Sequence, residues 1–198
     1  MKRDTIIKAG INLIPYVGSS LATLYFDKKE NNRFERLEQF YQEIKEELDE
    51  NPIDNSNFDN HNKEQLENLI EDIHNKVELE TRETKKRLLR NFFIETIKRP
   101  VLGDFDKRKT FLDILDRLSD LECQLLAFLS THNDPIQIKN LTGTDIYILY
   151  SGVNKLISFG LLETRRGSYT MNGTQDENLD NLIFLSDYGK EFIEYIKI

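Results

Sequence analysis

Hydrophobic residues recur at helical spacing along most of this chain. From residue 33 to residue 50 the apolar positions alternate at intervals of three and four, which predicts an amphipathic helix with one buried stripe. The same spacing continues over residues 63–98 and predicts a single long helix, whose last turns carry a second apolar stripe. Pro100 and Gly103 end that helix, and a further helix is predicted at residues 106–118. We therefore expect a helical bundle in the first part of the chain.

A second domain is predicted to begin at Ser119. The Ser-Asp-Leu-Glu sequence that starts there has the form of a capping box, in which the Ser and Glu side chains bind each other's backbone N–H groups at a helix N-terminus. The pattern then predicts helix, turn, short helix, turn, helix, strand hairpin and helix, with strands at 161–165 and 182–185. The predicted fold class is mainly α, with a helical domain at 1–118 and a smaller α+β domain with a two-stranded wing at 119–198.

Two short segments of the second domain carry a resemblance to a known fold. ISFGLL at residues 157–162 joins the predicted third helix to the hairpin, and LSDYGKEF at residues 185–192 follows the hairpin. With this order of elements, residues 119–198 resemble a winged-helix domain. That resemblance implies a third helix able to enter the major groove of DNA and a wing able to meet the DNA backbone or minor groove.

The whole chain also resembles a recurring type of bacterial and prophage protein. That type joins a Gly/Pro-containing N-terminal segment to a helical middle and a C-terminal winged helix. The residues that carry this resemblance are LIPYVG at 13–18, TKKRLL at 84–89 and FLDILDRLS at 111–119. The resemblance implies a bacterial, prophage or mobile-element setting, and it implies no activity.

The least polar segment of the chain is residues 6–26, which contain no acid. One interpretation is a buried helical hairpin within residues 1–27 that turns at residues 15–18. The other is a membrane-prone segment that contacts anionic lipid, because Lys and Arg residues flank it. Lys8 and Asn12 make the segment more polar than an ordinary spanning helix. The membrane interpretation depends on Ile11, Leu13, Ile14, Pro15, Val17, Gly18 and Leu21.

Composition describes a soluble globular protein and limits its partners. The 198 residues are 38% hydrophobic and 31% charged, with a formal net charge of -8. Residues 119–198 hold six basic and eleven acidic residues, a net of -5, which opposes extensive wrapping of nucleic acid.

Cys123 is the single cysteine and cannot form a disulfide framework, so a reducing cytoplasm is the expected location. The alternative location is peripheral, with the protein at the inner face of the membrane. On its mostly apolar helix, Cys123 itself is expected to be core.

Few residues suggest chemistry. Glu71 and His74 have the Glu-x-x-His spacing of di-iron ligands in helical bundles, but such a site needs a second copy of the motif, which the sequence lacks. With Glu67 and Glu78 they form a stripe without apolar residues, which we interpret as a solvated acidic face. The sequence has no Gly-rich phosphate loop, His-Glu-x-x-His, Gly-x-Ser-x-Gly or spaced cysteine pair for zinc. We therefore predict no catalytic residues, no cofactor, no metal site and no small-molecule substrate.

A DNA-contact set can be drawn from the second domain. Its members lie on the outward face of the predicted third helix, which Thr144 can cap, and at the end of the first hairpin strand. The set is Tyr147, Ser151, Asn154, Lys155, Ser158, Arg165 and Arg166. Denser basic runs lie elsewhere, and we interpret them as solvated charges whose stems cover a bundle helix. These runs are Arg82, Lys85, Lys86, Arg87 and Arg90, then Lys98, Arg99, Lys107, Arg108 and Lys109.

Three functions are consistent with the sequence. The favoured one is a non-enzymatic interaction or adaptor protein, whose acidic winged helix contacts a protein partner or forms a homo-oligomer. The first alternative is a winged-helix transcriptional regulator that binds duplex DNA. The second alternative is a membrane-active effector that uses residues 6–26 on an anionic membrane.

Overall fold

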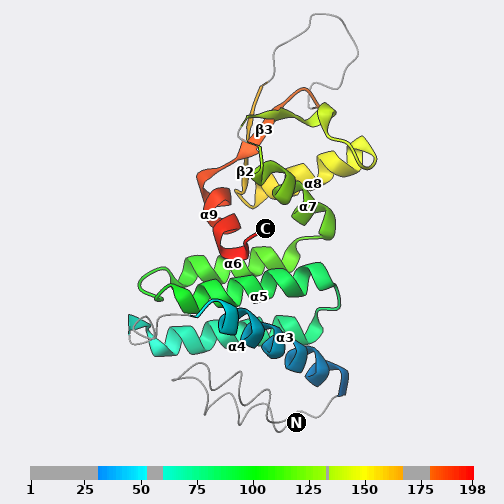
Figure 1. The fold of residues 1–198 in the computed structure, drawn as a ribbon. Helices are drawn as coiled ribbons and strands as arrows, with labels where there is room; N and C mark the ends of the chain where they lie inside the picture. Colours follow the sequence, from blue (N-terminus) through cyan, green and yellow to red (C-terminus); the bar gives the residue numbers. More distant parts are fainter. Residues whose placement is uncertain (1–30, 53–59, 133, 167–178) are drawn as a thin grey trace, which may run out of the picture. The chain divides into compact units, whose positions relative to one another are not determined.

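The computed structural model describes residues 31–52, 60–132, 134–166 and 179–198, and Figure 1 shows their helices and strands. The chain divides into two compact units, with the boundary between Asp116 and Arg117. The mainly helical fold predicted from the sequence is confirmed, with seven α-helices and a small antiparallel sheet among the described residues. Both interpretations of residues 6–26, the buried hairpin and the membrane-prone segment, fall outside the described residues.

Four described helices make up the first unit. They are α3 (Asn31–Glu50), α4 (Lys63–Leu79), α5 (Glu83–Lys98) and α6 (Phe105–Arg117), whose last residue already belongs to the second unit. α3 packs on both α4 and α5, and α4 packs on α5. The core contains aromatic side chains from three helices among its aliphatic ones, because Tyr41 of α3, Phe92 and Phe93 of α5, and Phe111 of α6 are all buried.

The prediction of one helix over residues 63–98 is wrong, because the chain breaks between α4 and α5. The Glu80 carboxylate accepts hydrogen bonds from the backbone N–H of Thr81 at 2.9 Å and of Arg82 at 2.8 Å. It also pairs with the Arg82 guanidinium at 2.7 Å. Burial raises the pKa of Glu80, but the hydrogen bonds from Arg82 and Thr81 outweigh burial and lower it to about 2. Such local side-chain bonds compete with helical backbone bonds, and the continuous apolar spacing on both sides hides the break.

The second unit combines three helices with a three-stranded sheet. Its elements are α7 (Asp120–Ser130), β1 (Ile136–Gln137), the 3₁₀ turn η2 (Ile138–Asn140), α8 (Ile146–Ser158), β2 (Leu162–Arg165), β3 (Leu182–Leu185) and α9 (Asp187–Ile196). The central strand β3 pairs antiparallel with β1, with Ile136 opposite Ile183, and with β2, with Leu162 opposite Leu185. Two predictions are wrong here. The sheet has a third strand beyond the predicted two, and the predicted short second helix is a single 3₁₀ turn. A two-residue strand carries no alternating pattern, so only its pairing with β3 reveals it.

Short polar side chains begin the helices of the second unit. The predicted capping box is confirmed, because the N–H of Glu122 donates to Ser119 Oγ at 3.4 Å and the N–H of Ser119 donates to Glu122 Oε2 at 2.6 Å. The cap of α8 is Asp145 and not the expected Thr144. Asp145 Oδ1 accepts hydrogen bonds from two N–H groups of the first turn, at 2.9 and 3.3 Å.

The two segments behind the winged-helix resemblance meet where α9 begins. Gly160 follows α8 in the left-handed region, with φ of 75°, and its carbonyl oxygen accepts a hydrogen bond from Ser186 Oγ at 2.5 Å. The N–H of Ser186 donates to the Leu161 carbonyl at 3.0 Å. Ser186 Oγ in turn accepts from the N–H of Gly189 at 2.8 Å. α9 comes so close to this bend that a Cβ at position 189 would overlap the Leu161 carbonyl oxygen, so the packing requires glycine there.

Candidate interaction surface

The outer face of α8 brings together four members of the predicted DNA-contact set. α8 buries its inner face through Leu149, Val153 and Leu156. The four exposed residues on the other side are Tyr147, Ser151, Asn154 and Ser158. Tyr147 is aromatic, and the other three side chains are polar and uncharged. This face therefore offers hydrogen-bonding groups and an aromatic ring without positive charge.

Lys155, the one cation in the sequence of α8, is engaged within the second unit. Its Nζ donates hydrogen bonds to the Arg117 carbonyl at 2.7 Å and to Glu122 Oε2 at 2.8 Å. Burial raises the pKa of Glu122, but hydrogen bonds from Lys155 and Ser119 outweigh burial and lower it. The carboxylate is therefore ionised at neutral pH and neutralises the lysine. A lysine held in this way contributes little attraction to a DNA phosphate.

The two arginines of the predicted set lie on the sheet side of the unit, because Arg165 ends β2 and Arg166 follows it. Both are exposed. The Arg165 guanidinium lies 4.8 Å from the centre of the Phe184 ring, which is within the range of a cation–π contact. No hydrogen bond or ion pair joins either arginine to another of the described residues. They are thus the members of the set that could still meet a phosphate.

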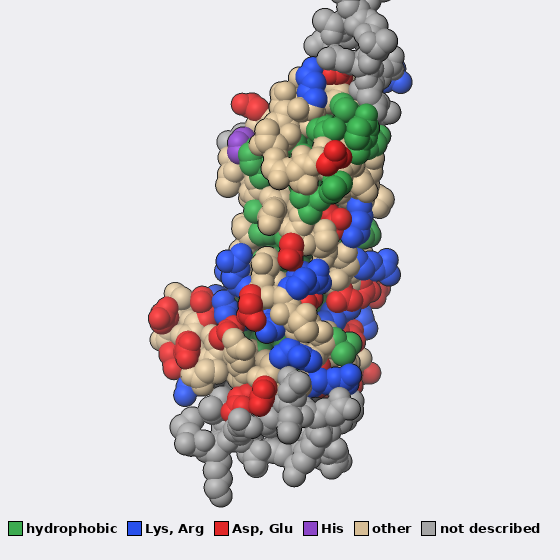
Figure 2. All heavy atoms as spheres, turned by 90° about the vertical axis from the view of Figure 1, so that its right-hand side faces the viewer, with side chains coloured by type: hydrophobic (Ala, Val, Ile, Leu, Met, Phe, Trp, Pro, Cys, Tyr) green, Lys and Arg blue, Asp and Glu red, His purple; other side chains and the backbone are tan. Residues whose placement is uncertain are grey.

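Exposed hydrophobic side chains occur on both helices of the α7–α8 pair. Tyr147 and Ile148, in the first turn of α8, are 62% and 52% exposed, and Phe128 of α7 is 42% exposed. We call the adjacent residues Tyr147 and Ile148 the apolar patch. Figure 2 shows hydrophobic side chains gathered on the face of the second unit that is turned to the viewer, with few charged ones among them. Exposed aromatic and aliphatic groups of this size are typical of protein-binding surfaces when they occur together.

α7 and α8 pack directly on each other. Lys155 of α8 pairs with Glu122 of α7, and a Cβ at Gly152 of α8 would contact both Leu121 and Leu125 of α7. This packing buries one side of α8 and leaves the side chains of Tyr147 and Ile148 exposed.

Sequence reasoning identified Tyr147, counted Phe128 with Leu125 and Leu129 among the apolar residues that define the first helix of the domain, and did not single out Ile148. One signal for Ile148 is present in the sequence, because it directly precedes Leu149 and lies outside the stripe that α8 buries. No comparable signal marks Phe128. A phenylalanine next to a buried stripe is usually part of the core, and only the packing of neighbouring elements leaves this one exposed.

The predicted solvated acidic stripe on α4 is wrong at His74, which is buried. Its Nε2 is hydrogen-bonded to the hydroxyl of Tyr41 from α3, and its ring stacks near that of Phe93 from α5. Burial lowers the pKa of His74 to about 3 and raises the pKa of Tyr41. Both groups are therefore neutral at physiological pH and link α3 to α4 in the core. Among the described residues, no group of three or more His, Cys, Asp or Glu side chains could hold a metal ion.

Two of the cations predicted to be solvated are buried instead. Lys85 is fully buried, and its Nζ donates a hydrogen bond to the Leu115 carbonyl of α6. Arg108 is 1% exposed, and its guanidinium satisfies acceptors around the C-terminus of α5. These acceptors are the carbonyls of Thr96 at 3.3 Å, Arg99 at 2.8 Å and Pro100 at 2.9 Å, and Asp104 Oδ2 at 2.8 Å. Both cations therefore serve to hold the fold of the first unit.

His61 supports the same end of α5. The N–H of Val101 donates to His61 Nδ1 at 3.2 Å, so the proton lies on Nε2, which donates to the Ile97 carbonyl at 2.9 Å. Burial lowers the pKa of His61. The neutral ring is required for this arrangement, because a protonated Nδ1 cannot accept a hydrogen bond.

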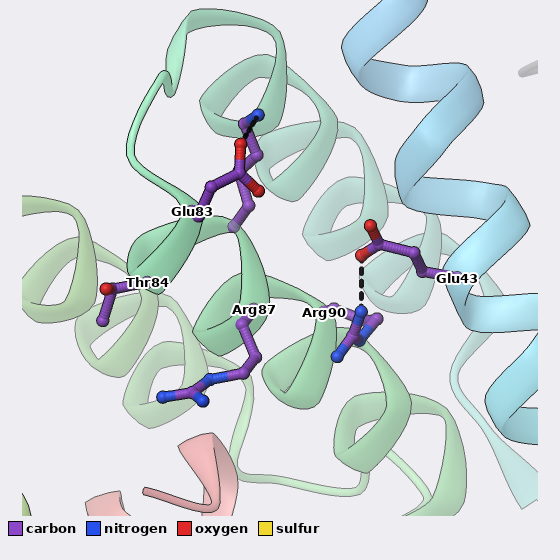
Figure 3. Close-up of a pocket in the computed structure, with 6 residues that line it drawn as sticks. Glu43, Glu83, Thr84, Arg87 and Arg90 are labelled. Atoms are coloured by element: carbon purple, nitrogen blue, oxygen red, sulfur yellow. Dashed lines mark hydrogen bonds and ion pairs between the residues drawn. The ribbon is translucent and has the colours of Figure 1, made fainter.

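A pocket of about 310 Å³ lies between α3 and α5 and is lined mainly by charged side chains (Figure 3). The lining residues are Glu43, Glu83, Thr84, Lys86, Arg87 and Arg90. Arg90 is ion-paired with Glu43, and Lys86 pairs with Glu83 at 2.7 Å. Figure 3 shows Arg87 pointing away from the Arg90–Glu43 pair. Because Lys86 and Arg90 are already paired and Arg87 points away from them, we interpret these side chains as a structural link between α3 and α5 and not as a binding site.

No protein-family model, curated protein or solved structure matches this chain. Within the described ranges, no helix is both long and apolar enough to cross a membrane. The functional conclusion therefore depends on the surface of the second unit.

Proposed function

We propose that this chain is a non-enzymatic interaction protein, and that its second unit is a winged-helix module that binds a protein partner through α8 and the apolar patch. The observation that carries this proposal is the exposure of Tyr147 and Ile148 beside uncharged polar side chains on α8. Protein interfaces depend on a few large side chains, aromatic ones above all, that become buried at their centre. The outer face of α8 has this composition.

Duplex DNA is the second candidate partner, and the exposed Arg165 and Arg166 favour it. Affinity for DNA comes largely from cations that neutralise phosphates. α8 offers only Lys155, which Glu122 and the Arg117 carbonyl already hold. Residues 119–198 also carry a net charge of -5. These charges favour a protein partner over DNA.

Photo-crosslinking from α8 tests the proposal. Tyr147 is replaced by p-benzoylphenylalanine in the full-length chain, and the exposed Glu163 of β2 is replaced in the same way as a control. Irradiation of the native cells should give a discrete crosslinked protein from position 147 and not from position 163. The product should disappear when Ile148→Ser is added. Equal products from both positions, or none from position 147, would contradict the proposal.

Fluorescence anisotropy with a labelled duplex tests the DNA alternative on the purified full-length chain. A regulator should bind duplex with an affinity that falls steeply as salt rises, and the double variant Arg165→Glu, Arg166→Glu should lose this binding. The proposal predicts weak binding that is the same in the wild-type chain and in the variant. Salt-dependent binding that the variant loses would replace the interaction module with a DNA-binding regulator.

A further inference from the structure

We infer further that the partner segment is cationic and amphipathic, so that its apolar side chains cover the apolar patch and a Lys or Arg residue pairs with Asp145 at the edge of that patch. This inference rests on the proposed function and names the class of partner. An amphipathic segment docks by placing apolar anchors against an exposed apolar surface. The apolar patch supplies such a surface, since Tyr147 and Ile148 are each more than half exposed.

Asp145 places a negative charge at the rim of the apolar patch. It is exposed and directly precedes the first turn of α8, where Tyr147 and Ile148 lie. Both capping hydrogen bonds use Oδ1. No hydrogen bond joins Oδ2 to another of the described residues. A partner cation can therefore pair with Oδ2 while the helix cap stays intact.

The lysines of the second unit do not offset this charge, because three of them are paired with acids of the same unit. These pairs are Lys139–Asp180 at 2.7 Å, Lys155–Glu122 at 2.8 Å and Lys190–Asp187 at 2.9 Å. The surplus of acids leaves residues 119–198 with a net charge of -5. A negative potential of this kind attracts a cationic segment and increases its rate of association.

The same charge disfavours two other occupants of the apolar patch. A second copy of the chain would bring two Asp145 carboxylates and two units of net charge -5 toward each other, which costs Coulomb energy. An acidic or neutral apolar segment would cover the Tyr147 ring but leave Asp145 without a cation. The cationic amphipathic segment satisfies both the apolar and the charged part of the surface.

Designed peptides test this inference on the full-length chain by fluorescence anisotropy. The probe is a fluorescein-labelled peptide of Leu and Lys, about 18 residues long, with the leucines on one helical face. One control peptide has Glu in place of every Lys. A second control has the composition of the probe with the leucines spread around the helix. We expect the probe to bind about tenfold more tightly than either control, with an affinity that falls as salt rises.

Asp145→Asn is the most informative variant, because Asn caps a helix about as well as Asp but carries no charge. It should weaken probe binding about fivefold and reduce the salt dependence, with an unchanged melting temperature. The double variant Tyr147→Ser, Ile148→Ser should weaken binding by about tenfold or more. As a matched control, Glu163→Gln removes an exposed charge from β2 and should leave binding within about twofold.

The outcomes separate this inference from the proposed function. If the Glu peptide binds as tightly as the probe, or if Asp145→Asn changes nothing, the cationic class is wrong, while a crosslink from position 147 still supports a protein partner. If position 147 gives no crosslink, both fail. If light scattering shows a dimer that the Tyr147→Ser, Ile148→Ser variant dissociates, the occupant is a second copy and the inference is overturned.

Discussion

The two units of this chain use polar side chains in different ways. In the first unit, long polar side chains are buried and hold helices together from within, as Lys85 and Arg108 do with backbone carbonyls. In the second unit, short side chains such as Ser119 and Asp145 begin helices at the surface or near it. The contrast is one of degree, because Asn62 also caps α4 in the first unit and Glu122 is a buried, paired carboxylate in the second.

The exposed surfaces differ in a corresponding way. Figure 2 shows many Lys, Arg, Asp and Glu side chains on the first unit and fewer on the second, where hydrophobic groups are visible. Several charges of the first unit neutralise each other, as in the Arg90–Glu43 and Lys109–Asp72 pairs. In the second unit, the side chains of Tyr147 and Ile148 remain mostly exposed to solvent. Large exposed apolar side chains also occur in the first unit, at Leu79 and Leu102, so what distinguishes the second unit is that Tyr147 and Ile148 are adjacent in the first turn of one helix.

The largest effect should come from Arg108→Met in the first unit. The change leaves the carbonyls of Arg99 and Pro100 and the Asp104 carboxylate without their guanidinium donor. We expect a loss of about 4 kcal/mol in the free energy of unfolding of that unit, as for other broken buried ion pairs. Hydrogen exchange of peptides from residues 31–116 measures the loss. Lys109→Met, which breaks the half-exposed pair with Asp72, is the control and should cost less than about 1 kcal/mol. Equal losses in the two variants would contradict the buried role of Arg108.

A second large effect should come from Gly189→Ala in the second unit. The new Cβ would overlap the backbone carbonyl of Leu161, which cannot move away as a side chain can. We expect a loss of about 3 kcal/mol in stability, detected by hydrogen exchange in peptides from residues 179–198. Gly152→Ala is the matched control, because the three nearest atoms to its Cβ all belong to side chains, with the flexible ends of Leu125 and Leu121 closest at 3.2 Å and 3.6 Å. A Gly189→Ala chain as stable as the Gly152→Ala chain would refute this close approach.

Mild acid should destabilise the first unit more than the second. His74 is buried with a pKa of about 3, and burial also lowers the pKa of His61, so the folded unit keeps both rings neutral. Between pH 6.5 and 3 the unfolded chain therefore binds more protons than the folded chain, and stability falls as pH falls. From the shift at His74 alone, we expect a loss of about 2 to 3 kcal/mol between pH 7.5 and pH 4.5.

Hydrogen exchange at pH 7.5 and pH 4.5, corrected for the intrinsic exchange rate, resolves this acid effect by unit. His74→Leu should reduce the pH dependence in residues 31–116, because the buried group no longer takes up a proton on unfolding. A pH dependence of the same size in His74→Leu would show that other groups cause it.

The smallest effect on stability should come from the double variant Tyr147→Ser, Ile148→Ser. Both side chains are more than half exposed, so their replacement should change the free energy of unfolding by less than about 1 kcal/mol. Thermal unfolding followed by circular dichroism measures this change. If instead the variant unfolds like Gly189→Ala, the two residues belong to the core of the second unit and the apolar patch is not a free surface.

Local patterns predicted those features that depend on neighbouring residues in the chain. The capping box at Ser119 formed as expected, since both of its hydrogen bonds join residues three apart. The strands β2 and β3 pair where the hairpin was predicted. The exposure of Tyr147, Ser151 and Asn154 followed from the helical period of α8. Most of the polar face of the candidate surface could therefore be predicted.

Two of the failed predictions depend on residues far away in the chain. β1 exists only because β3 pairs with it. His74 looked solvated in an acidic stripe, but Tyr41 from another helix covers it. The third failure is local: the apolar spacing continues across the break between α4 and α5, and the hydrogen bonds of the Glu80 carboxylate to the next two residues turn the chain there.

The sequence by itself determined the mainly helical class, the net negative charge of residues 119–198 and the capping box at Ser119. These features follow from composition or from residues a few positions apart. Only the tertiary structure decided that Lys85 is buried, that Lys155 is neutralised and that Phe128 and Ile148 are exposed. The reason is that burial and charge pairing depend on groups far away in the chain, as the 33-residue separation of Lys155 and Glu122 shows. A linear pattern records which side chains are present, and packing decides which of them water or a partner can reach.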